Sequence, residues 1–98
     1  MYGTVARMKV KPGAEEDFRK LMNEMSADGE ATMRGWVSTT VYRADNDPRE
    51  LWIAVVFQSR EAYHNNAGSP EQDQRYQKMR ALLDSDPEWH DGEIISGG

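Results

Sequence analysis

The sequence predicts an α+β fold in which two amphipathic helices cover one face of an antiparallel sheet. Residues 51–57 are all apolar, which is typical of a strand with both faces withdrawn from water. Two other segments, residues 14–25 and 69–83, carry apolar side chains at helical spacing. The remaining strands are predicted from stretches that alternate in polarity or are rich in β-branched residues.

The first strand is predicted over residues 2–11, where side chains alternate in polarity. Pro12-Gly13 ends this strand, and the acidic residues 15–17 supply the negative first turn of a helix. We expect this helix to end at Asp28-Gly29. The strand side chains expected to face the helices are Tyr2, Thr4, Ala6, Met8 and Val10.

The second half of the chain begins with a strand at residues 36–42, which a turn over residues 45–48 joins to the apolar strand 51–57 as a hairpin. Ser59 is expected to cap a short helix that extends to about residue 67. Ser69, Pro70 and Gln72 form a capping-box start for the second long helix. Asp86-Pro87 is expected to stop that helix, and residues 89–96 form a last short strand.

The resulting order, β-α-β-β-α-β, is that of the ferredoxin-like arrangement, in a single domain over residues 1–98. Both helices of such a fold lie on one face, so Val5, Trp52, Ala54 and Val56 are left on the other. We expect a second copy of the chain to cover this open face. The predicted assembly is therefore a symmetric homodimer that encloses a barrel.

Composition excludes several classes of function. A net charge of -5 disfavours a nucleic-acid partner, which needs a basic patch to neutralise phosphates. The chain has no cysteine, no apolar run of the roughly 20 residues that span a bilayer, and no signal-peptide pattern. We therefore expect a cytoplasmic protein with no membrane partner. No metal-ligand spacing, phosphate loop or nicotinamide or flavin fingerprint is present, so no cofactor is expected.

Several short segments carry the turns, caps and aromatic positions of a known family. They are Lys11-Pro-Gly13 with Glu16 and Phe18, Gly35-Trp36, residues 41–45 with Pro48, and residues 57–63. In these segments the chain resembles the antibiotic-biosynthesis monooxygenase domain family of the dimeric α/β-barrel superfamily, over nearly its whole length. The resemblance implies a ligand pocket between the helices and the sheet. It also implies relatives that include cofactor-independent oxygenases of polycyclic aromatics, a quinol oxygenase and haem-degrading enzymes.

The haem-degrading branch of that family offers a test at single residues. Its members are marked by an asparagine, a tryptophan and a histidine at positions that fall at or near Ala6, Phe57 and Tyr76 in this sequence. None of the three matches, which disfavours haem degradation. Tyrosine is nonetheless able to ligate haem iron, so haem binding through Tyr76 stays open.

The resemblance implies a small aromatic or quinol-like substrate that is deprotonated and then reacts directly with dioxygen. His64 and Tyr76 are the candidate catalytic residues, because imidazole titrates near neutral pH and a buried tyrosine hydroxyl needs a partner. Alternatively, His64 is an exposed polar residue on a short helix and Tyr76 is a core aromatic.

The candidate substrate-binding residues are mostly apolar. Trp36, Phe57 and Tyr63 have rings that could stack on a planar ligand, and Met79 offers an adaptable wall. Arg80 is a possible counter-charge for an enolate or carboxylate. Each of the apolar residues also reads as ordinary core. The alternative function is accordingly a homodimer that binds a small molecule, or haem, without turnover.

Overall fold

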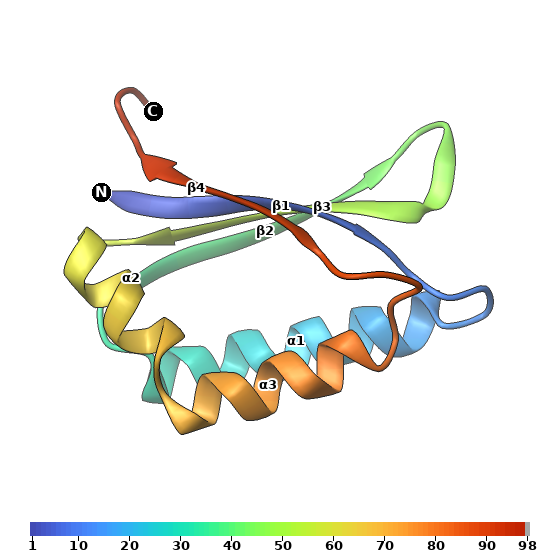
Figure 1. Cartoon of the computed structure of the whole chain (residues 1–98), viewed down its shortest axis with the longest axis horizontal. Coiled ribbons are helices and arrows are strands. Elements are labelled where there is room, and N and C mark those ends of the chain that lie inside the picture. The colour runs from blue at the N-terminus through green and yellow to red at the C-terminus, as the bar shows by residue number, and fades with distance from the viewer. Residues whose placement is uncertain (98) are drawn as a thin grey trace.

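A computed structural model describes residues 1–97, with the side chains of residues 28–32 left out. Its elements are β1 (Tyr2–Lys9), α1 (Glu15–Thr32), β2 (Trp36–Ala44), β3 (Asp47–Phe57), α2 (Arg60–Ala67), α3 (Pro70–Arg80) and β4 (Glu88–Glu93). The strands form one antiparallel sheet in the order β2-β3-β1-β4. All three helices lie on one face of that sheet (Figure 1). The predicted ferredoxin-like α+β fold is confirmed.

The alternation of β1 sets which side chains enter the core. Thr4, Ala6 and Met8 are buried, whereas Val5 is 45% exposed on the opposite face. Because directly paired residues of an antiparallel ladder share a face, the partners of Ala6, which are Ile53 and Trp89, also point toward the helices. The core cluster consists of Ala6, Met8, Val10, Phe18, Leu51, Ile53, Met79 and Leu83.

The first helix is longer than predicted. It does not end at Asp28-Gly29 but continues to Thr32, since a single glycine weakens a helix without preventing it. The chain reverses only at Gly35, whose φ of +79° lies in the left-handed region that glycine adopts most easily. The sequence signal at residues 28–29 was therefore a weaker stop than the one six residues later.

The β2–β3 hairpin is tighter than predicted. Only Asp45 and Asn46 form the turn, and Pro48 belongs to β3. The ladder register shifts between Arg43 and Ala44, so residues 48–50 have no partner in β2 and form a bulge in β3. A proline is tolerated there because its missing N–H would have no ladder partner.

Both predicted helix caps are present. The hydroxyl of Ser59 accepts from the backbone N–H of Ala62 at 3.1 Å, and that of Ser69 accepts from Gln72 N–H at 3.1 Å. The side chain of Gln72, however, does not complete a capping box, because it bonds with Asn66 and Arg75 instead. This difference places an amide group inside the layer between helices and sheet.

The last part of the chain also departs from the predicted bounds. α3 ends at Arg80, before Asp86-Pro87, because the following backbone pairs with the end of the first strand. Lys11 N–H donates to Leu82 C=O, and Asp84 N–H donates to Lys9 C=O. The final strand is Glu88–Glu93 rather than residues 89–96.

The open face of the sheet carries a mixture of apolar and charged side chains. Trp52, Ala54 and Val56 are half-buried there, on the face opposite the helices. Arg7 pairs with Glu50 at 2.5 Å on the same face, and this hydrogen bond holds the pKa of Glu50 below its usual value. The predicted contents of the open face are confirmed.

Candidate active site

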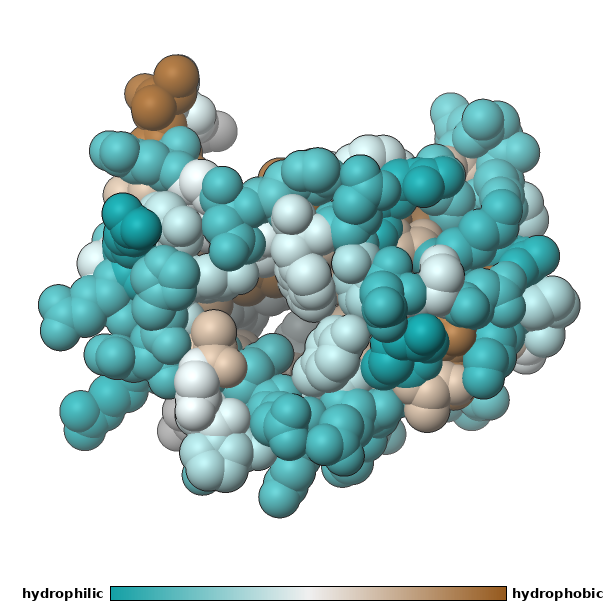
Figure 2. All heavy atoms as spheres, viewed as in Figure 1, coloured by the Kyte–Doolittle hydropathy of each residue, from teal (hydrophilic) through white to brown (hydrophobic). Residues whose placement is uncertain are grey.

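A cavity of about 420 Å³ lies between the sheet and the helices. Figure 2 shows the molecule hollowed at this level, between the sheet layer and the helical layer. A volume of this size is within the range of sites for small organic ligands. Its apolar lining includes the methionines Met8, Met22, Met25, Met33 and Met79 and the aromatic residues Phe57, Tyr63, Tyr76 and Trp89. Flexible thioethers and flat rings together suit a planar apolar ligand.

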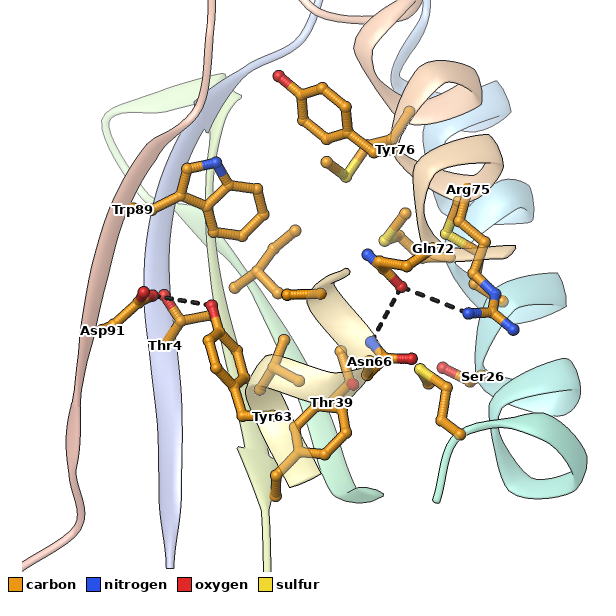
Figure 3. A pocket seen from close by; sticks show the side chains of 18 of the residues that line it. Thr4, Ser26, Thr39, Tyr63, Asn66, Gln72, Arg75, Tyr76, Trp89 and Asp91 are labelled. Carbon is orange, nitrogen blue, oxygen red and sulfur yellow. Dashed lines mark hydrogen bonds between the residues drawn. The ribbon is translucent and has the colours of Figure 1, made fainter. Parts of the chain in front are cut away.

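One end of the cavity carries a cluster of oxygen atoms from three elements. Tyr63 of α2 donates a hydrogen bond of 2.8 Å from its hydroxyl to Asp91 Oδ1 of β4. Thr4 of β1 is the ladder partner of Asp91 and lies beside the pair (Figure 3). Thr4 is 4% exposed, and its hydroxyl oxygen makes no hydrogen bond of normal geometry among the described residues, although it lies near enough to the Tyr63 oxygen to act on the pKa of that group. A buried hydroxyl without a partner is costly, so this group is available to a ligand.

The hydroxyl of Tyr63 stays protonated over a wide pH range. Withdrawal from water, followed by its hydrogen bond to Asp91, raises the pKa of Tyr63 to about 12. Tyr63 therefore acts as a proton donor that orients the carboxylate of Asp91. It does not supply a tyrosinate base near neutral pH.

A second polar cluster lies on the helical side of the cavity (Figure 3). Gln72 Oε1 accepts from Asn66 Nδ2 at 3.2 Å and from Arg75 Nη1 at 3.4 Å. A guanidinium only donates, so Arg75 requires Gln72 to present its oxygen in that direction. The amide nitrogen of Gln72 is thereby turned toward the cavity.

The structure brings four of the residues singled out from the sequence into the cavity lining: Phe57, Tyr63, Tyr76 and Met79. Phe57 and Tyr63 meet edge to face with ring centroids 5.6 Å apart. The ring centroids of Tyr76 and Trp89 are 6.4 Å apart, and both rings lie at the other end of the cavity from Tyr63 (Figure 3).

The structure places the other three outside the described lining. His64 is exposed, and its ring packs against Tyr2 and Tyr63. Trp36 donates from its indole N–H to Thr39 Oγ1 at 2.9 Å, so it supports a lining residue without being one. Arg80 donates to Asp86 and to the carbonyl of Leu83, beyond the end of α3. None of these three side chains reaches the cavity because each is held by a local partner.

Sequence reasoning missed the polar residues Thr4, Gln72 and Asp91 and the aromatic residue Trp89. Thr4 was placed on the inward side of its strand without a role, and Gln72 was taken for a cap. The alternation of Trp89 and Asp91 in the last strand was a usable signal, because both share one face. Its meaning depended on knowing that this strand pairs with β1.

The part of the chain that the structure describes contains no group of three or more His, Asp or Glu side chains arranged to hold a metal ion. Within the same residues, none of the helices is long and apolar enough to cross a bilayer.

Comparison with models of known protein families identifies the family of the chain. Residues 1–78 match the model of the antibiotic biosynthesis monooxygenase family. The chain belongs to this family. A comparison with curated protein sequences gives no match.

Solved structures of this family and of related proteins share the fold. SnoaB, a cofactor-independent oxygenase from Streptomyces nogalater, superposes with a TM-score of 0.83 at 20% identity, over 98% of this chain and 94% of that one. A protein from Caulobacter crescentus named for the same family gives 0.84 at 18% identity, over 97% and 90%. A conserved protein from Methanosarcina mazei gives 0.80 at 18% identity, over 93% and 89%. At these identities the likeness concerns the fold alone.

Proposed function

We propose that this member of the antibiotic biosynthesis monooxygenase family is a cofactor-independent monooxygenase of a small hydroxylated aromatic or quinol-like substrate, active as a homodimer. The observation that carries the proposal is the cluster of Thr4, Tyr63 and Asp91 in an otherwise apolar cavity. A hydroxyl group on a flat ring satisfies that cluster, and the methionine and aromatic walls hold the ring. The name of SnoaB, a cofactor-independent oxygenase, supports the reaction class.

Each polar residue has a distinct role in the proposed reaction. Asp91 accepts the hydroxyl proton of the substrate, because an ionised carboxylate can accept from a ligand as well as from Tyr63. Tyr63 holds Asp91 in position, and the hydroxyl of Thr4 donates to the oxygen that becomes negative. Phe57, Tyr76 and Met79 are walls. The proton-accepting role proposed from the sequence for His64 passes to Asp91, which lines the cavity.

The reaction needs no reductant other than the substrate. Loss of the proton gives an anion whose charge extends to the ring carbon opposite the oxygen. That carbon forms a bond to dioxygen, and the resulting peroxide loses water. For a phenol with a free position there, phenol plus O₂ gives quinone plus water, and the substrate supplies all four electrons. The apolar walls contact the ring of this anion, whereas Asp91 at its oxygen end is exposed.

The test is dioxygen uptake with α-naphthol as substrate, together with detection of the naphthoquinone product by absorbance. We expect uptake equal to product formed, and a loss of about 10²–10⁴-fold in Asp91→Asn if Asp91 is the proton acceptor. The control is Asp73→Asn, which changes a cavity-lining carboxylate of α3 that makes its hydrogen bond with Gln77 and not with Tyr63. Binding of α-naphthol without uptake would support the alternative, a binding protein without turnover. An absorbance band of bound haem that Tyr76→Phe abolishes would support haem binding instead.

A further inference from the structure

The second polar cluster has no part in holding the substrate hydroxyl, yet it faces the same cavity. Gln72 is fixed at its oxygen by two donors, Asn66 at 3.2 Å and Arg75 at 3.4 Å. Its amide nitrogen has no acceptor among the described residues and is turned into the cavity (Figure 3). An oriented N–H in an apolar cavity is a site for an oxygen atom that carries no proton.

The chemistry of the first cluster gives this donor a purpose. Carboxylates titrate near pH 4 and phenols near pH 10, so a carboxylate is a weak base for an ordinary phenol. The difference between these two pKa values becomes smaller when the phenolate charge spreads onto a conjugated carbonyl oxygen. A donor at that oxygen stabilises the anion more than the neutral phenol, as oxyanion-binding groups do. Gln72, whose oxygen is held by Asn66 and Arg75, is placed for this task across the cavity from Asp91.

We propose that the side-chain amide of Gln72 binds a carbonyl oxygen of the substrate, so that the substrate is a hydroxylated aromatic with a conjugated carbonyl at its other end. This inference rests on the proposed function, which places the hydroxyl group of the substrate at Asp91. Asn66 and Arg75 are positioning residues, because they act through the amide of Gln72. The two clusters together then select ligands with a donor at one end and an acceptor at the other.

The test is binding of three probes by isothermal calorimetry. The first is a β-naphthol with an acetyl group conjugated at the far end of the ring system, the second is β-naphthol, and the third is the same acetylnaphthalene without the hydroxyl. The variants are Gln72→Glu, which keeps the oxygen and removes the donor, and Gln72→Leu, which removes both without adding charge. Gln74→Glu on the exposed side of α3 is the matched control for charge and fold.

We expect both Gln72 variants to raise the Kd of acetylnaphthol by about tenfold, since a good hydrogen bond contributes about that factor. Their Kd values for β-naphthol should change by less than about twofold, and Gln74→Glu should leave all three unchanged. Equal losses for acetylnaphthol and β-naphthol would overturn the inference, because they would indicate a structural role. So would the absence of any loss, or the failure of the wild-type protein to bind acetylnaphthol.

A spectroscopic measurement separates charge stabilisation from simple binding. The naphtholate form absorbs at longer wavelength than the neutral form, so the pKa of bound acetylnaphthol can be read by titration. We expect this pKa to be about one unit higher in Gln72→Glu than in the wild-type protein, because the donor is lost and a carboxylate takes its place. An unchanged value would overturn the inference. Dioxygen uptake with α-naphthol is measured in parallel: probe selectivity without that uptake would remove the monooxygenase proposal and leave the role of Gln72 intact.

Discussion

Thr4 and Asp91 are directly opposed on the β1–β4 ladder, yet Asp91 takes its hydrogen bond from Tyr63 of α2 rather than from Thr4. The hydrogen bond to Asp91 thus comes from a helix residue and not from its partner on the neighbouring strand. This arrangement leaves a buried hydroxyl beside an oriented carboxylate, which is an unfavourable arrangement for an empty core and a favourable one for a ligand hydroxyl. The hydroxyl of Thr4 should therefore lower the stability of the empty protein and strengthen ligand binding, and both effects can be measured.

Thr4→Val tests whether the hydroxyl of Thr4 has opposite effects on stability and on ligand binding. Valine has the shape of threonine without the hydroxyl. The free energy of unfolding of the variant should therefore equal that of the wild-type protein or exceed it by about 1 kcal/mol. The same change should weaken binding of α-naphthol by about tenfold, because the ligand oxygen loses a donor. Urea unfolding and calorimetry give the two quantities. A large loss of stability would mean that the hydroxyl has a partner in the folded chain.

Tyr63→Phe tests the raised pKa of the tyrosine. The folded chain holds this proton more tightly than the unfolded chain, where the pKa is 10.0, and keeps it until about 12. The contribution of Tyr63 to the unfolding free energy is therefore complete below pH 10.0 and is lost as pH rises toward about 12. In Tyr63→Phe the decline of the unfolding free energy over that interval should be shallower, as read by urea unfolding at a series of pH values. The slope for Asp91→Asn should lie between those of the wild-type protein and Tyr63→Phe, because Tyr63 stays half-buried but loses its carboxylate partner. Identical slopes in all three proteins would contradict a raised pKa of Tyr63.

Gly35→Ala tests why the chain turns where it does. A Cβ at Gly35, where φ is +79°, would lie 2.6 Å from Ala62 Cβ, whereas at Gly13, where φ is +84°, it would meet nothing within 4 Å. Gly13→Ala should therefore cost about 1–2 kcal/mol for the backbone conformation alone. Gly35→Ala should cost about 1–3 kcal/mol more, because it adds an overpacked contact. Relative to Ala62→Gly alone, adding Gly35→Ala should then cost only the first part, and thermal unfolding of the five proteins, wild type included, checks the cycle.

The proposed homodimer is tested by native mass spectrometry and sedimentation. We expect the wild-type protein at twice its 11.2 kDa mass. Val5→Lys should produce a folded monomer, because Val5 is 45% exposed on the open face and a charge there needs no space inside the chain. Gln74→Lys, on the helical side, should leave the dimer intact. A wild-type monomer would show that the open face needs no second copy.

Local sequence patterns were sufficient for the strands, helices and caps. The alternation of residues 2–10 gave the inward set of β1, and the serines at 59 and 69 gave the starts of two helices, because these signals depend on a residue and its near neighbours. The helix stop at Asp28-Gly29 failed for a related reason. Glycine permits a left-handed turn but does not compel one, and the surrounding packing chose Gly35.

By itself, therefore, the sequence determined the α+β fold and the open face of the sheet, and it singled out four residues that line the cavity, Phe57, Tyr63, Tyr76 and Met79. Tertiary structure decided the polar chemistry of that cavity. Asp91, Tyr63 and Thr4 come from β4, α2 and β1, and only the strand order places β4 beside β1 and both beneath α2. Gln72 is an ordinary cap residue in sequence, and it becomes a cavity donor only because Asn66 and Arg75 hold its oxygen. Such roles depend on directional bonds between distant segments, which no local pattern encodes.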